Sequence, residues 1–144
     1  LAAWYGDKGA VYRYSNMTNE PLPWIDELLE LRRMVVQACG NRFNSVLANY
    51  YRSGSDSMGW HSDDERELGP DPLIASVSLG GDRRFLLRHR QDRHAAKHEV
   101  TLEHGSLLVM DRGVQSEWQH AIPKTQRKVL PRINLTFRNV EKSN

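Results

Sequence analysis

The fold is decided by the run Arg132-Ile133-Asn134-Leu135-Thr136-Phe137-Arg138, in which polar and apolar residues alternate without a break. Successive side chains of a β-strand leave opposite faces, so the two arginines, the amide and the hydroxyl share one face of this strand. Such alternation alone is typical of a strand with one wet face. Two guanidiniums turned into a core are costly without a partner, so the run predicts a bound anion.

A second pattern lies upstream of this run. His61-Ser62-Asp63 is followed after a gap of 57 positions by His120, and the run itself begins twelve positions further on. Two imidazoles and one carboxylate are the ligand set of a non-haem Fe(II) site with open coordination positions. On an extended strand His61 and Asp63 would leave the same face. One H-x-D among six histidines is usually a surface turn, but the order of the three pieces favours a metal centre of His61, Asp63 and His120.

The composition bounds the class of protein. The chain has 144 residues, 39% of them hydrophobic and 26% charged, which predicts one globular domain over residues 1–144. We expect neither a membrane span nor a signal peptide, because no apolar run approaches the necessary length. Cys39 is the single cysteine, which excludes an intramolecular disulfide and a cysteine-rich zinc site and favours a reducing compartment.

Hydrophobic periodicity predicts one helix and many short strands. Apolar residues recur at near-helical spacing from about Pro23 to Ala38, and Gly40 stands where a C-terminal cap would lie. The expected strands are at about 10–14, 45–51, 73–79, 83–90, 97–102, 105–111, 117–121 and 131–139. Many strands with one flanking helix in a chain of this size indicate a mainly β fold with a jelly-roll core.

Basic residues are concentrated in one stretch, although the formal net charge is only +2. Six basic side chains stand between positions 83 and 97, against one acid, Asp92. They are Arg83, Arg84, Arg88, Arg90, Arg93 and Lys97. The run alone is more typical of a solvated strand and loop, and the small net charge does not by itself indicate nucleic acid.

Taken together, the motifs resemble the AlkB family of Fe(II)/2-oxoglutarate dioxygenases, in particular the branch of AlkB homologues two and three. The likeness runs through almost the whole chain in the family's order. The matching stretches are Ala3-Trp4-Tyr5-Gly6, Tyr12-Arg13-Tyr14-Ser15, Phe43-Asn44-Ser45, Asn49-Tyr50-Tyr51-Arg52, Trp60-His61-Ser62-Asp63-Asp64-Glu65, Ile74-Ala75-Ser76, Trp118-Gln119-His120 and Pro131 with the run that follows it. The 83–98 stretch looks individual, and we expect this branch to carry a further leading segment ahead of the first motif.

The resemblance implies a double-stranded β-helix (jelly roll) with Fe(II), 2-oxoglutarate and dioxygen as cofactor and co-substrates. The far carboxylate of 2-oxoglutarate needs a cation of fixed geometry, and a guanidinium binds a carboxylate through two parallel hydrogen bonds. In the family this part falls to the first arginine of the run, here Arg132, helped by Tyr51. The other implied contacts of the oxoacid are Asn49, Asn134, Thr136 and Arg138, the last near the iron-proximal carboxylate or beside the metal ligands.

The resemblance also implies a reaction. Decarboxylation of 2-oxoglutarate to succinate is coupled to oxidation of an N-alkyl carbon, which leaves a nucleobase as formaldehyde. Bases such as 1-methyladenine and 3-methylcytosine are positively charged at neutral pH, so a carboxylate in the pocket wall would favour them. Asp64 matches the family's substrate-contacting acid and Glu65 is the second candidate, while strand alternation leaves open that Asp64 faces solvent.

The alkylated base has to leave its stack to reach the metal, and aromatic side chains can then hold it. The family's segment that covers the flipped base matches residues 12–14, although aromatics in a short strand could equally be core. Leu47 is expected to line the pocket because it shares a strand face with Asn49. The expected substrate contacts, besides the two acids, are therefore Tyr12, Arg13, Tyr14, Trp4 and Leu47.

Two other interpretations stay open. The same cofactor chemistry could act on a modified RNA base or on a substrate other than nucleic acid. A non-catalytic jelly-roll binding module would lack a metal ligand or the anchor arginine, and neither is missing here. We expect a monomer in the cytoplasm, or in the nucleus if the source is eukaryotic, that repairs alkylated DNA, with RNA as the alternative partner and no membrane partner.

Overall fold

The computed structural model describes residues 1–14 and 17–141. Ser15, part of one matching motif, and the side chain of Tyr14 lie outside this description. In chain order the elements are β1 (Ala2–Gly6), β2 (Tyr12–Tyr14), β3 (Met17–Asn19), α1 (Asp26–Cys39), β4 (Ser45–Tyr51), β5 (Met58–His61), the short 3-10 helix η1 (Arg66–Leu68), β6 (Ile74–Gly80), β7 (Arg83–His89), β8 (His98–Leu102), β9 (Ser106–Met110), α2 (Val114–Glu117), β10 (Trp118–Ile122) and β11 (Arg132–Arg138).

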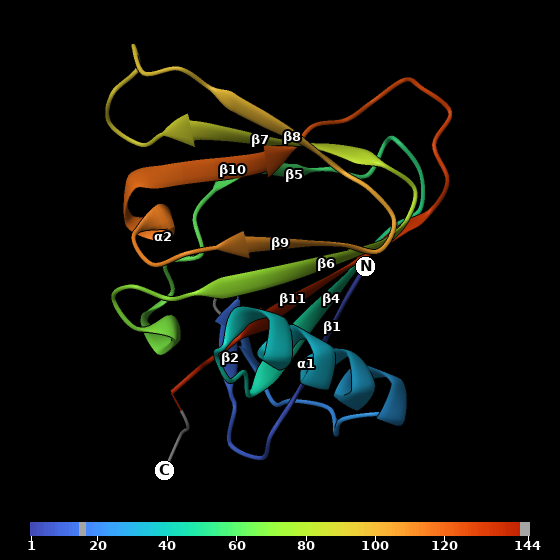
Figure 1. The fold of residues 1–144 in the computed structure, drawn as a ribbon, viewed down its shortest axis with the longest axis vertical. Helices are drawn as coiled ribbons and strands as arrows, with labels where there is room; N and C mark the ends of the chain where they lie inside the picture. The colour runs from blue at the N-terminus through green and yellow to red at the C-terminus, as the bar shows by residue number, and fades with distance from the viewer. Residues whose placement is uncertain (15–16, 142–144) are drawn as a thin grey trace.

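Two antiparallel sheets face each other and form the jelly roll that was predicted. One has the strand order β1-β4-β11-β6-β9 and the other the order β5-β10-β7-β8. Figure 1 shows them as a lower and an upper layer, with α1 beneath the lower one. Strands that are distant in the sequence are neighbours in both sheets, so the interior between the layers collects residues from the whole chain.

The helix α1 covers the outer face of the larger sheet. Its buried residues Leu28 and Val35 pack with Val46, Leu135 and Phe137 in one apolar cluster. The helix ends at Gly40 as predicted, where a φ of 66° and a bond from the Gly40 N–H to the Val36 carbonyl form the cap. It begins at Asp26 and not at Pro23, because Ile25 is still extended.

The run that decides the fold is β11, the central strand of the larger sheet. Its apolar side chains lie on the outer face, where Leu135 and Phe137 are buried while Ile133 remains 41% exposed. Its polar side chains point between the sheets and are all buried: Arg132, Asn134, Thr136 and Arg138. The polar face of this strand therefore lines the space between the two sheets.

The sequence did not predict β1, β3, β5 or α2. The missed strand β5 carries His61 at its last position, so Asp63 lies beyond the strand. The expectation that His61 and Asp63 share one strand face is therefore wrong, since the chain leaves the sheet between them. The pairing of β10 with β5 also shifts register between His120 and Ile122.

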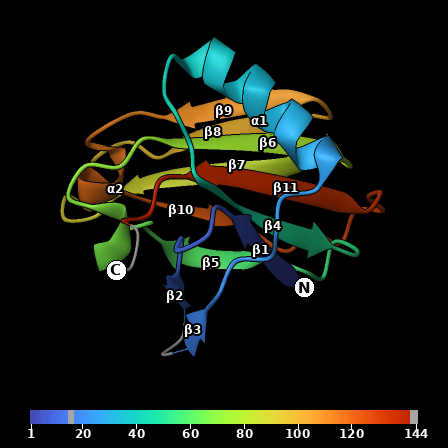
Figure 2. The same cartoon turned by 90° about the horizontal axis from the view of Figure 1, so that it is seen from below.

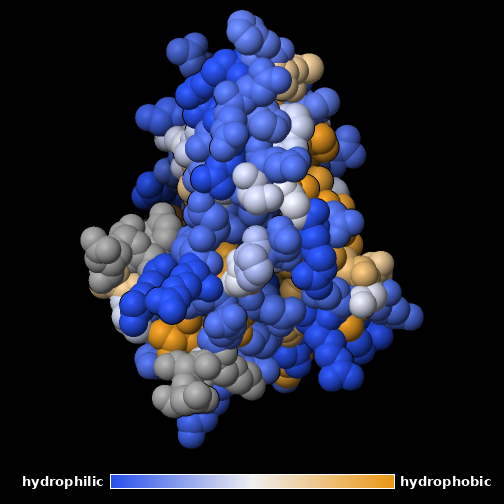
Figure 3. Space-filling view, turned by 90° about the vertical axis from the view of Figure 1, so that its left-hand side faces the viewer, coloured by the Kyte–Doolittle hydropathy of each residue, from blue (hydrophilic) through white to orange (hydrophobic). Residues whose placement is uncertain are grey.

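The β2–β3 hairpin stands apart from the two large sheets (Figure 2). The face at the left-hand side of Figure 1 is largely hydrophilic, with hydrophobic residues only in small groups (Figure 3). Within the described ranges, no helix is long and apolar enough to cross a membrane.

Candidate active site

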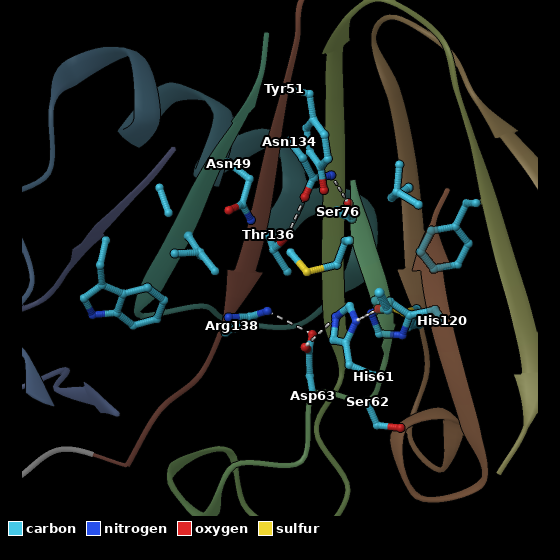
Figure 4. Close-up of a pocket in the computed structure, with 18 of the residues that line it drawn as sticks. Asn49, Tyr51, His61, Ser62, Asp63, Ser76, His120, Asn134, Thr136 and Arg138 are labelled. Atoms are coloured by element: carbon cyan, nitrogen blue, oxygen red, sulfur yellow. Dashed lines mark hydrogen bonds and ion pairs between the residues drawn. The ribbon is translucent and has the colours of Figure 1, made fainter. Parts of the chain in front are cut away.

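A cavity of about 480 Å³ opens between the two sheets. Figure 4 shows the candidate metal ligands facing one another at one end of it and Tyr51 at the other. Almost all of the predicted site residues line this cavity, although they come from separate motifs: Trp4, Tyr12, Leu47, Asn49, Tyr51, His61, Asp63, Glu65, His120, Arg132, Asn134, Thr136 and Arg138.

The three predicted metal ligands meet at one point. One ligand atom from each of His61, Asp63 and His120 lies within 4.8 Å of the other two. The two histidines face each other across the β5–β10 pair, with ring centroids 4.2 Å apart. His61 donates from Nδ1 to the Gly59 carbonyl at 2.7 Å, which leaves Nε2 free to bind a metal.

The protonation states of these groups suit a cation. Burial lowers the pKa of His120 to about 4, so its ring is neutral at neutral pH. Burial alone would raise the pKa of Asp63, but Arg138, His120 and His61 together hold it below its ordinary value. Metal ligands have to be deprotonated, as these two are. The buried Nδ1 of His120 has no partner in the part of the chain that the structure describes, so the residues fit a metal centre.

Arg138 is the direct partner of the candidate ligand Asp63. Its guanidinium donates to Asp63 Oδ2 at 3.0 Å, and both side chains are buried (Figure 4). Burial opposes the charge of Arg138, but Asp63, Tyr12 and Glu65 together outweigh it and raise the pKa of the guanidinium. The Nε and NH1 groups of Arg138 have no partner among the described residues. Arg138 therefore orients a metal ligand and keeps two donors for a bound anion.

Arg132 is the second buried cation, and it is only 1% exposed. It donates to the Ser78 hydroxyl at 3.0 Å, and its guanidinium carbon lies 4.9 Å from the centroid of the Tyr51 ring. Among the described residues, neither its Nε nor its NH1 has a hydrogen-bond partner, and no ion pair includes it. A buried guanidinium with free donors is expensive unless an anion binds it, so Arg132 suits the far carboxylate of a dicarboxylic acid.

A chain of hydrogen bonds lines the cavity between Arg132 and the metal ligands. Thr136 donates to the Asn134 side-chain carbonyl at 2.7 Å, and the Asn134 amide donates to the Ser76 hydroxyl at 2.6 Å. Sequence reasoning did not assign Ser76 or Ser78 to the site. The sequence pattern could have indicated them. The two serines stand two positions apart within the otherwise apolar and buried start of β6, so they share its inner face.

Another part of the cavity lining is aromatic and acidic. The rings of Trp4 and Tyr12 stack with centroids 4.8 Å apart, and Tyr12 donates from its hydroxyl to Glu65 Oε1 at 2.5 Å. Leu47 lies nearby, packed against the same cluster. Arg13 is exposed and does not line the cavity, so the structure does not support a pocket role for it.

The expectation for Asp64 needs a correction. Asp64 is exposed, lies outside the cavity and faces Arg90, with 3.5 Å between its Oδ2 and a guanidinium nitrogen. Its neighbour Glu65 is the carboxylate that reaches the cavity wall. Asp63, Asp64 and Glu65 lie in the irregular segment between β5 and η1, where the side chains of Asp64 and Glu65 have different surroundings.

The basic stretch is more heterogeneous than its sequence suggested. Arg83 is buried and donates to the carbonyls of Ser53, Asp56 and Pro123, so it holds loops together and cannot bind phosphate. Arg84 is paired with Glu99. Arg88 lies over the ring of Trp60, with 4.4 Å between its guanidinium carbon and the ring centroid, and bonds to Gln119.

The arrangement defines a class of protein: a jelly roll in which a His-Asp-His triad could hold a metal ion beside two buried guanidiniums that, among the described residues, keep unpartnered donors. The sequence pattern of the 2OG-Fe(II) oxygenase superfamily matches residues 1–138. The chain belongs to this superfamily, whose cofactors are Fe(II), 2-oxoglutarate and dioxygen, and within it to the AlkB family.

Curated relatives lie in the expected branch. Alpha-ketoglutarate-dependent dioxygenase alkB homolog 3 of Bos taurus is 44% identical over 97% of this chain and 51% of its own length. DNA oxidative demethylase ALKBH2 of Homo sapiens is 43% identical over 96% of this chain and 55% of its own length. The chain thus spans about half the length of these relatives. The solved structure of OsALKBH1 has the same fold, with a TM-score of 0.64 at 20% identity over 96% of this chain and 77% of that one.

Proposed function

We propose that this protein is an Fe(II)/2-oxoglutarate-dependent oxidative demethylase that removes N-alkyl groups from the bases of alkylated DNA. The proposal rests on one observation: the His61-Asp63-His120 triad, the guanidinium of Arg132 and the carboxylate of Glu65 all line the same cavity. The relatives named as dioxygenase and DNA oxidative demethylase support the same reaction.

Each part of the cavity has a share in this reaction. His61, Asp63 and His120 would hold Fe(II), which when bound supplies the oxidative chemistry that couples loss of carbon dioxide from 2-oxoglutarate to oxidation of the alkyl carbon. Arg132 binds the far carboxylate of the oxoacid beside Tyr51, and Arg138 offers two donors near the triad. Asn49, Asn134 and Thr136 line the space between these ends.

Glu65 is suited to recognise a cationic base. Its Oε1 accepts the hydrogen bond from Tyr12, while its Oε2 is buried and has no partner within the described ranges. A buried carboxylate oxygen in this state favours a positively charged ligand over a neutral one. The stacked Trp4 and Tyr12 add the aromatic surface that an unstacked base requires.

Glu65→Gln should therefore slow turnover of 1-methyladenine and 3-methylcytosine by about 10- to 100-fold, since a hydrogen bond to a charged group is worth about 1.5–3 kcal/mol. The uncoupled decarboxylation of 2-oxoglutarate without nucleic acid should change much less, because it does not involve the base. Both rates are measured at matched iron content.

Asp64→Asn is the matched control, since it removes the neighbouring carboxylate, which faces Arg90 outside the cavity. We expect this variant to retain most of its demethylation rate. If Glu65→Gln lowered the rates of the coupled and uncoupled reactions equally, Glu65 would stabilise the metal centre and would not recognise the base.

Binding to nucleic acid should weaken steeply with added salt, and Arg88 should contribute to the slope. Arg88→Gln should flatten the slope of log affinity against log salt by about 0.9 on duplex DNA and about 0.7 on a single strand, for one lost phosphate contact. Arg84→Gln is the control, because Glu99 already pairs with Arg84. An unchanged slope in Arg88→Gln would show that Arg88 makes no phosphate contact and would favour the interpretation of residues 83–97 as an ordinary solvated surface.

The substrate is tested by succinate and formaldehyde formation on methylated oligonucleotides of matched sequence in DNA and RNA form. We expect the DNA form to be turned over. Exclusive turnover of the RNA form would contradict DNA as the substrate and assign the activity to RNA. We further propose a monomer that acts in the cytoplasm, or in the nucleus of a eukaryote, where the unpaired Cys39 would stay reduced.

A further inference from the structure

The metal ligand Asp63 is held in place by a segment that sequence reasoning did not connect with it. Asp63 lies beyond the end of β5, so no strand pairing fixes its backbone. Instead, Ser62 and Asp63 bond directly to the segment made of α2 and the start of β10, and Asp64 is linked to it through Arg90. The Ser62 hydroxyl donates to the Trp118 carbonyl at 2.6 Å, and the Asp63 N–H donates to Gln115 Oε1 at 2.7 Å.

The third contact runs through Arg90. Its guanidinium pairs with Asp64 and also donates to the Gln115 backbone carbonyl at 3.1 Å. The Arg90 N–H donates to the Glu117 carbonyl at 2.8 Å, which ties the end of β7 to α2. The irregular segment that carries Asp63 is thereby attached to the segment that leads directly into His120.

Gln115 is the centre of this arrangement. It is 1% exposed, although a buried amide is costly unless both of its ends are satisfied. Its oxygen accepts from Asp63, and its nitrogen donates, among the described residues, only to the Met110 sulfur at 3.3 Å. A thioether is a weak acceptor, so the strong bond of this side chain is the one to the metal ligand.

We propose that Gln115 is a positioning residue of the metal centre, which fixes the Asp63 backbone so that its carboxylate faces the two histidines. The two oxygens of that carboxylate are then directed separately. Oδ2 accepts from Arg138 at 3.0 Å, and Oδ1 lies 3.8 Å from His61 Nε2. Gln115 thus bonds to the backbone of Asp63, and Arg138 bonds to its side chain. This inference rests on the metal centre of the proposed function but not on its nucleic-acid substrate.

The test is Mn(II) binding to the metal-free protein, with Mn(II) as an inert substitute for Fe(II). Gln115→Met keeps the size of the side chain and removes the acceptor, and it should weaken Mn(II) binding by about 10- to 100-fold, as the loss of a partner behind a metal ligand does. The visible absorption spectrum of the Co(II)-loaded protein should also change, because the ligand geometry is altered. The thermal midpoint of the metal-free variant reports whether it is folded.

Two further variants separate positioning from packing. Ser116→Ala changes the next residue of α2, whose hydroxyl donates to the Gly113 carbonyl, and should leave Mn(II) affinity and the Co(II) spectrum unchanged. Gln115→Glu keeps an acceptor for the Asp63 N–H and should bind Mn(II) near the parent affinity. If Gln115→Met fails to fold, the Mn(II) affinity of Gln115→Glu still tests whether the acceptor at position 115 positions Asp63.

Parent-like Mn(II) affinity in folded Gln115→Met would overturn the proposal, and so would a loss in Gln115→Glu as large as that in Gln115→Met. These outcomes differ from failure of the proposed function. That failure would appear as a parent protein that binds Mn(II) through His120 but does not demethylate any base.

Discussion

Replacing His120 with alanine should abolish turnover of 2-oxoglutarate. The change leaves two metal ligands of three, and its ring cannot be replaced by a neighbour, because it projects from the centre of β10 directly opposite His61. The fold should persist, because the β10 pairing is made by backbone. The ring that is removed contacts Phe85, stacked at a centroid distance of 5.2 Å, and His61, edge-on at 4.2 Å. We expect activity below detection and Mn(II) binding that is lost in parallel.

His94→Ala is the control for this variant. His94 is exposed, lies in the loop between β7 and β8, and does not line the cavity. It should turn over 2-oxoglutarate at the parent rate with the parent metal content. A His120→Ala protein with near-parent turnover would show that the metal is held elsewhere.

Arg132→Lys should raise the apparent KM for 2-oxoglutarate sharply. Lysine keeps the charge but offers a point charge where the guanidinium offers parallel donors, and neither Nε nor NH1 of Arg132 has a hydrogen-bond partner in residues 1–14 and 17–141. Loss of one charge-assisted hydrogen bond costs about 1.5–3 kcal/mol, which corresponds to an increase in KM of about 10- to 100-fold. Initial rates at varied 2-oxoglutarate and saturating oligonucleotide measure this effect.

Arg33→Lys provides the comparison, because Arg33 is exposed on α1 and pairs with Glu30 away from the cavity. Its KM should equal that of the parent. If Arg132→Lys also had the parent KM, the anchor would have to be assigned to another cation, and Arg138 would be the first candidate.

The sequence predicted the features that depend on periodicity. The alternation at 132–138 placed four polar side chains on one inner face, and the structure has them there because β11 is paired on both sides along its length. The helical spacing and Gly40 likewise predicted α1 to within a few residues. These elements are long enough for a pattern to repeat.

The features that depend on tertiary contacts could not be predicted in this way. The strand β5 has four residues, one of them Gly59, and forms because β10 pairs with it. The four-residue helix α2 shows no pattern, yet it carries the Gln115 side chain that holds Asp63.

The two adjacent acids illustrate the same limit. Alternation along an ideal strand could not decide between Asp64 and Glu65 as the acid of the pocket wall. The outcome depends on the irregular backbone after β5 and on the distant partners of the two side chains. Arg90 pairs with Asp64 outside the cavity, while Tyr12 binds Glu65 within it.

The most direct test of the central claim is a single-turnover experiment. The Fe(II)-loaded protein is mixed with 2-oxoglutarate, dioxygen and a DNA oligonucleotide that contains one 3-methylcytosine. Succinate, formaldehyde and the unmethylated base are then quantified together. We predict equal amounts of the three products, with none from His120→Ala. Succinate without formaldehyde or base repair, on DNA and RNA alike, would contradict the assignment of this protein as a nucleobase demethylase.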